Sequence, residues 1–94
     1  MLRATDPQLR IYVTGQQLAL LKKHDFPCSE RVLASARTTE KGIELTGSWV
    51  DFDMLAGFVA GEANYARRNR RPRQTELLDD IADQLESALA SHRR

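Results

Sequence analysis

This chain of 94 residues has a single cysteine, almost no net charge and no long apolar run. The single cysteine, Cys28, excludes an internal disulfide and any zinc site made of cysteines alone. A formal net charge of +1 gives no overall field that would draw the chain to nucleic acid or to a membrane surface. The most apolar stretch, 54–63, is half of the roughly 20 residues needed to span a bilayer. With no export signal visible, we expect one small cytoplasmic domain over 1–94, with flexible ends at 1–8 and 91–94.

Motifs for catalysis and cofactor binding are missing as well. The five glycines stand at least four residues apart, so neither the dinucleotide-binding pattern nor the P-loop pattern can be drawn. His24 lies four residues before Cys28, but Pro27 interrupts any helix that would align them as base and nucleophile. Glu62 lies near Tyr65 and would suit acid–base chemistry if it were desolvated, although pairing with an arginine is the favoured interpretation. We therefore expect no enzyme, no cofactor and no metal site.

The first half of the chain predicts a small sheet. Alternating apolar residues indicate strands at 9–14 and 43–46, and 32–37 is predicted as a further strand between them. The second and third strands are expected to form a hairpin around a turn at 38–42. Between the first two strands, Thr14 and Gln17 have the spacing of a capping box, which predicts a short helix that ends near His24.

Two longer helices are predicted, at 51–68 and 74–91. The second is amphipathic, and Pro72 just before it is tolerated at a first helical turn. The first has one apolar stripe made of Phe52, Leu55, Val59, Ala63 and Ala66. A second stripe on a different side consists of Met54, Gly57, Phe58, Gly61 and Tyr65.

A helix that is apolar on two sides is expected to pack on two sides. The simplest arrangement places one stripe on the sheet and the other on the last helix, whereas the alternative places the second stripe on another subunit. Gly57 and Gly61 have the small-xxx-small spacing, which fits a close crossing with either of these partners. The complete order predicts an α+β fold, β-α-β-β-α-α, with a three-stranded antiparallel sheet, a short helix and a C-terminal helical hairpin.

The strongest functional signal is a run of five arginines in the turn 67–73, namely Arg67, Arg68, Arg70, Arg71 and Arg73. The planar guanidinium group suits both phosphate and carboxylate. The nearly neutral chain, the acidic helix that follows and the lack of interleaved aromatic residues all count against nucleic-acid binding. The favoured interpretation is that these arginines pair with the acidic face of the last helix, in the same chain or in a neighbour, or are simply solvated.

These observations lead to two hypotheses about function. The first is a protein-interaction or regulatory accessory module without catalytic activity. If this module is a homodimer, its expected subunit interface is Met54, Gly57, Phe58, Gly61 and Tyr65. The alternative is a nucleic-acid-binding accessory protein that uses the arginine-rich turn 67–73. Neither hypothesis involves a membrane.

Overall fold

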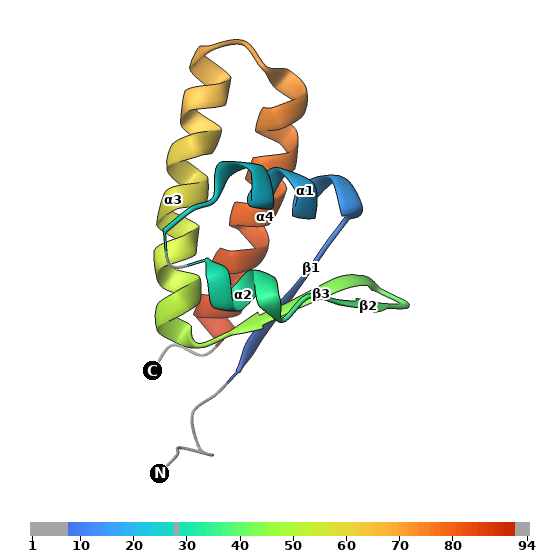
Figure 1. Ribbon diagram of the computed structural model, residues 1–94. Helices are drawn as coiled ribbons and strands as arrows, with labels where there is room; N and C mark the ends of the chain where they lie inside the picture. The colour runs from blue at the N-terminus through green and yellow to red at the C-terminus, as the bar shows by residue number, and fades with distance from the viewer. Residues whose placement is uncertain (1–7, 28, 92–94) are drawn as a thin grey trace.

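The computed structural model describes residues 8–27 and 29–91 (Figure 1). In chain order the elements are β1 (Leu9–Val13), α1 (Gly15–His24), α2 (Glu30–Ala34), β2 (Arg37–Thr39), β3 (Gly42–Gly47), α3 (Trp49–Arg68) and α4 (Pro72–Ser91). The predicted α+β class, the three-stranded antiparallel sheet and the C-terminal helical hairpin are confirmed. Cys28 and the predicted flexible ends, apart from Gln8 and Ser91, lie outside the described residues.

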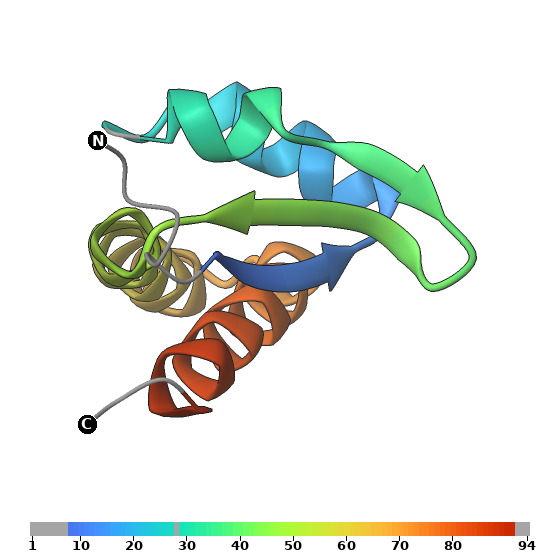
Figure 2. The ribbon, with the colours of Figure 1, turned by 90° about the horizontal axis from the view of Figure 1, so that it is seen from below.

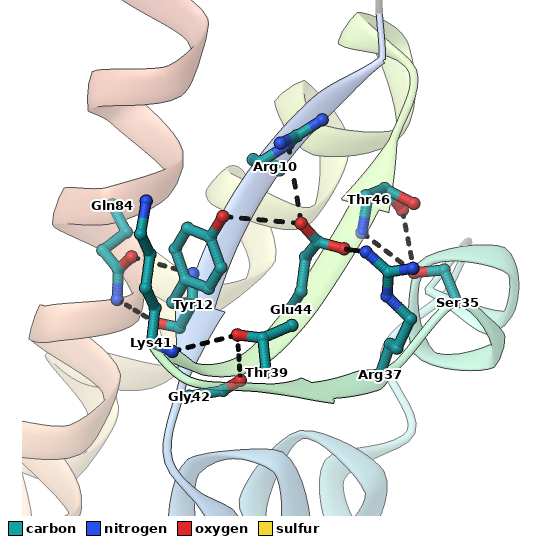
Figure 3. Close-up of polar contacts among 10 residues, drawn as sticks. All are labelled: Arg10, Tyr12, Ser35, Arg37, Thr39, Lys41, Gly42, Glu44, Thr46 and Gln84. Atoms are coloured by element: carbon teal, nitrogen blue, oxygen red, sulfur yellow. Dashed lines mark hydrogen bonds and ion pairs between the residues drawn. The ribbon is translucent and has the colours of Figure 1, made fainter.

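The sheet has the strand order β1-β3-β2, and both neighbouring pairs are antiparallel. Ile11 pairs with Leu45, and both side chains are buried on the same face together with Leu9 and Val13. α1 and α4 contact β1, and Figures 1 and 2 show the helices gathered on one side of the sheet. No described helix lies over the opposite face, which is the face seen in Figure 3.

The second strand is where the sequence-based prediction is wrong. Residues 32–34, predicted as strand, belong to the short helix α2, and β2 begins only at Arg37. Two contacts explain this outcome. The Ser29 carbonyl accepts the Leu33 N–H in a helical hydrogen bond of 2.9 Å, and the side chain of Val32 is fully buried in the core. A single helical turn therefore buries Val32, and the chain has too few alternating residues here to form a longer strand.

The first helix begins as predicted. The Thr14 hydroxyl accepts the Gln17 N–H at 3.1 Å, and the Gln17 side chain accepts the Thr14 N–H at 2.8 Å. The capping box is therefore confirmed. Gln17 is also buried, and its amide group donates to the Leu77 carbonyl and to Asp80 on α4. The same residue starts α1 and ties it to the last helix.

α3 packs against α4, and α4 packs against β1. The first apolar stripe of α3 is buried in full, as predicted, and comprises Phe52, Leu55, Val59, Ala63 and Ala66. α4 buries Leu78, Ile81, Leu85 and Leu89, while Leu77 and Ala88 are only partly buried. Pro72 is the first residue of α4, where its missing N–H removes no helical hydrogen bond.

Two side chains form hydrogen bonds with backbone groups of strand residues that have no partner strand on that edge (Figure 3). Gln84 of α4 accepts the Tyr12 N–H at 3.0 Å and donates its amide to the Tyr12 carbonyl, on the outer edge of β1. Ser35 accepts the Thr46 N–H at 2.9 Å, on the β3 edge beyond the end of β2. Unpaired strand edges invite association with other chains, so these side chains reduce the available edge.

Candidate interaction surfaces

The second apolar stripe of α3 lies outside the buried core. We call this stripe together with the exposed Val50 the α3 outer face, which thus comprises Val50, Met54, Gly57, Phe58, Gly61 and Tyr65. Its large side chains are exposed, with values of 61% for Val50, 40% for Met54, 37% for Phe58 and 48% for Tyr65. The first stripe belongs to the same buried core as the sheet and α4, and the large residues of the second are exposed, so the simplest arrangement predicted for the two stripes is wrong.

The two glycines of the α3 outer face are not at a helix crossing within the chain. A Cβ atom added at Gly57 or at Gly61 would meet no heavy atom within 4 Å, leaving aside neighbouring residues and the helix's own nearby backbone. Of the two partners that this spacing fits, a close crossing with α4 is therefore excluded at this position. Contact of these glycines with another subunit stays a prediction.

Phe58 is held by an aromatic stack at the side of the α3 outer face. Its ring stacks on Phe26, with centroids 6.3 Å apart, and Phe26 stacks on His24 at 5.1 Å. The Glu62 Oε2 atom lies 3.6 Å from Nδ1 of His24. Glu62 therefore faces a histidine, and the predicted arginine partner is wrong. His24 and Glu62 tie the end of α1 to the middle of α3.

The arginines of the turn 67–73 fall into two groups. Arg67 donates from Nη2 to both carboxylate oxygens of Asp79, at 3.1 and 2.8 Å, which is the pairing with the acidic helix that the sequence indicated. Arg73 donates to the Gln16 side chain at 2.8 Å. Within the described residues, the guanidinium groups of Arg68, Arg70 and Arg71 have no hydrogen-bond or ion-pair partner, and all three residues are exposed.

A hollow of about 490 Å³ lies beside this turn. It is lined by Arg67, Arg70, Arg71, Pro72, Thr75, Glu76 and Asp79. Two carboxylates share the hollow with three guanidinium groups, so the excess positive charge is small. The chain turns sharply here, because Arg70 adopts a left-handed backbone conformation with φ of 55°. The turn therefore presents Arg70 and Arg71 outward at one end of the helical hairpin.

One charged cluster was not predicted, and it lies on the uncovered face of the sheet (Figure 3). Glu44 of β3 is buried, and Nη2 of Arg37 on β2 donates to its Oε1 at 3.0 Å. On β1, Nε of Arg10 lies 3.7 Å from Oε2 of Glu44, and the Tyr12 hydroxyl donates to the same atom at 3.4 Å. One carboxylate thus joins all three strands. The sequence carries no local signal for the cluster, because only the strand register brings these residues together.

Two further sequence predictions concern metals and membranes. Among the described residues, no group of three or more His, Cys, Asp or Glu side chains is arranged to hold a metal ion. Cys28 and His92 lie outside those residues. Within the same part of the chain, none of the helices combines the length and the apolar character that crossing a bilayer requires.

Comparisons of this chain with protein-family models, with curated proteins and with solved structures gave no match.

Proposed function

We propose that this chain is a small non-catalytic binding module that docks another protein chain on the α3 outer face. The observation that carries the proposal is the row of exposed apolar side chains Val50, Met54, Phe58 and Tyr65 along a single helix. Exposed apolar patches on small proteins commonly mark interaction sites, and Met and aromatic residues are enriched there. The module would act as a regulatory or accessory subunit.

The glycines of this surface support the proposal on energetic grounds. A glycine in the interior of a helix costs about 1 kcal/mol relative to alanine. Gly57 and Gly61 bear this cost without making a contact inside the chain that excludes a side chain. Both positions therefore allow the backbone of a second chain to come close to α3.

A cytoplasmic location is part of the proposal. The chain has one cysteine and so cannot form an internal disulfide of the kind that stabilises many small secreted domains.

The proposal is tested by measuring complexes that depend on the α3 outer face. Wild-type protein, Phe58→Arg and the matched control Ala90→Arg are compared by light scattering and by immobilised capture from a cell extract. Ala90 is exposed on α4, so its change adds the same charge elsewhere. We expect complexes that the wild type and Ala90→Arg form but Phe58→Arg does not. If neither assay shows a complex lost in Phe58→Arg alone, the proposal is wrong.

Nucleic-acid binding by the arginine turn is a second candidate. The favouring observation is that Arg68, Arg70 and Arg71 carry guanidinium groups with no partner among the described residues. Exposed arginines of this kind suit contacts to a phosphate backbone. The carboxylates of Glu76 and Asp79 in the adjacent hollow weaken this candidate relative to the first.

Fluorescence anisotropy of labelled DNA and RNA at several salt concentrations tests the second candidate. Binding should weaken steeply with salt, and Arg70→Gln/Arg71→Gln should reduce the logarithmic salt slope by up to about 2, because each lost phosphate contact removes about 0.7–0.9. Lys22→Gln/Lys23→Gln on α1 is the matched control, since both lysines are exposed and far along the chain from the turn. No binding at low salt would remove the candidate.

A further inference from the structure

We infer that the occupant of the α3 outer face is a second copy of this chain, bound with the two α3 helices antiparallel about a two-fold axis at the level of Val59. This inference rests on the proposed function, because it names the partner for the same surface. Three properties of α3 support it, namely the spacing of its exposed residues, the placement of its charges and the side on which its large apolar residues lie.

The exposed residues are spaced almost symmetrically about Val59. Gly57 and Gly61 lie two residues on either side of it, and Val50 and Arg68 lie nine residues on either side. Met54 and Tyr65 lie five and six residues away. In an antiparallel pair, Gly57 would face the partner's Gly61 at the centre, where a Cβ atom has open space in the single chain. Farther along the helix in both directions from this point, the large residues of one copy would then contact those of the other.

The charged residues of α3 favour a second copy of this chain over an apolar partner of another kind. From Met54 to Gly61, every exposed residue of α3 is uncharged. Asp53 and Arg68 bracket this region, are exposed, and have no side-chain partner among the described residues. An antiparallel pair would bring Asp53 of each copy near Arg68 of the other, whereas a parallel pair would bring like charges together. Antiparallel packing also places the positive end of each helix dipole near the negative end of the other, which is favourable.

The large apolar residues lie on one side of the exposed surface. At 100° per residue, Met54, Phe58 and Tyr65 project to one side of the line through Gly57 and Gly61, and Asp53 projects to the other. A two-fold axis perpendicular to an antiparallel pair brings the same side of both helices together. Met54 would therefore contact the partner's Tyr65, a favourable pairing of sulfur with an aromatic ring. Phe58, held by its stack on Phe26, would fill the centre of this side.

Sedimentation equilibrium of the purified full chain over a wide concentration range tests the inference. We expect a reversible dimer for the wild type. Asp53→Arg and Arg68→Asp should each raise the dimer dissociation constant by about tenfold or more. Each variant creates a repulsive contact, and the two-fold axis makes that contact occur twice in the dimer. The double variant Asp53→Arg/Arg68→Asp restores opposite charges across the interface and keeps the net charge of the wild type, so its dimer should recover.

Each other outcome would overturn the inference. A wild type that stays monomeric at every concentration, single variants that dimerise like the wild type, or a double variant no stronger than the singles would each do so. Circular dichroism of every variant shows that the fold is retained. If the pure protein is monomeric but extract complexes still depend on Phe58, the second copy is excluded and the proposed function stands. If both measurements are negative, the proposed function fails too.

Discussion

At the scale of single residues, Gly47 is the glycine whose lack of a side chain the core requires. It lies at the end of β3, directly before α3 begins, and is buried. A Cβ atom added there would lie 2.9 Å from Cγ2 of Val32 and 3.0 Å from Cε1 of Phe52, and both of these side chains are fully buried. The strand-to-helix connection therefore passes close to the core only because this residue is glycine.

Gly47→Ala should destabilise the protein by about 1–3 kcal/mol, because Val32 and Phe52 must move to accommodate the methyl group. Chemical denaturation gives this free energy of unfolding. Gly15→Ala is the matched control, since a Cβ atom at Gly15 meets nothing within 4 Å. Its first-turn helical position predicts no loss of stability. Equal stability of Gly47→Ala and the wild type would show that the core adapts at no cost.

Gln84 is the second residue whose contribution to the stability of the fold follows from individual contacts. Its side chain forms both hydrogen bonds with the Tyr12 backbone on the outer edge of β1. Gln84→Leu has a similar volume but leaves the N–H and the carbonyl of Tyr12 unpaired, so we expect a loss of about 1–3 kcal/mol in the free energy of unfolding. Gln16→Leu removes only an exposed hydrogen bond to Arg73 and should cost no more than about 0.5 kcal/mol. Similar losses in the two variants would contradict this role for Gln84.

At the scale of secondary-structure elements, the sequence predicts the features that depend on nearby residues. It does not predict those that depend on contacts between distant residues. The capping box at Thr14 and the buried stripe of α3 depend on residues three and four apart, and both were predicted correctly. α2 was mistaken for a strand because the burial of Val32, a tertiary contact, decides the conformation of so short a segment. The Glu44 cluster was missed for a related reason, since it exists only once the strand register is fixed.

The two glycines of α3 allow helix stability and association to be separated. Gly57→Ala/Gly61→Ala should stabilise the single chain by about 1–2 kcal/mol, because alanine favours a helix and both positions have open space. The same change should weaken the proposed dimer, because two methyl groups would hold the helices apart at their closest approach. Urea denaturation at low protein concentration measures the first effect, and sedimentation equilibrium measures the second. A rise in both stability and dimerisation would show that the helices do not meet at these glycines.

At the scale of the whole molecule, the sequence shows that α3 is apolar on two sides but not which side the chain covers. α4 and the sheet both pack on the side of Phe52 and Val59, and this leaves Met54, Phe58 and Tyr65 exposed. The arrangement follows from the way the hairpin folds back over one side of the sheet, which is a property of the complete fold. The sequence therefore groups these residues into one stripe, and the structure shows that the large side chains of that stripe are exposed.

Self-association through this surface would couple the stability of the whole molecule to its concentration. A partner that binds only the folded chain stabilises it by mass action, by about 2.7 kcal/mol when the free partner is at 100 times the dissociation constant. For a domain of this size, 1 kcal/mol corresponds to about 4–8 °C in the melting temperature. We therefore expect the melting temperature of the wild type to rise by several degrees or more with concentration. Phe58→Arg should remove this dependence, whereas Ala90→Arg should keep it. Calorimetry at matched concentrations measures all three proteins, and a wild-type melting temperature independent of concentration would contradict association of the folded chain.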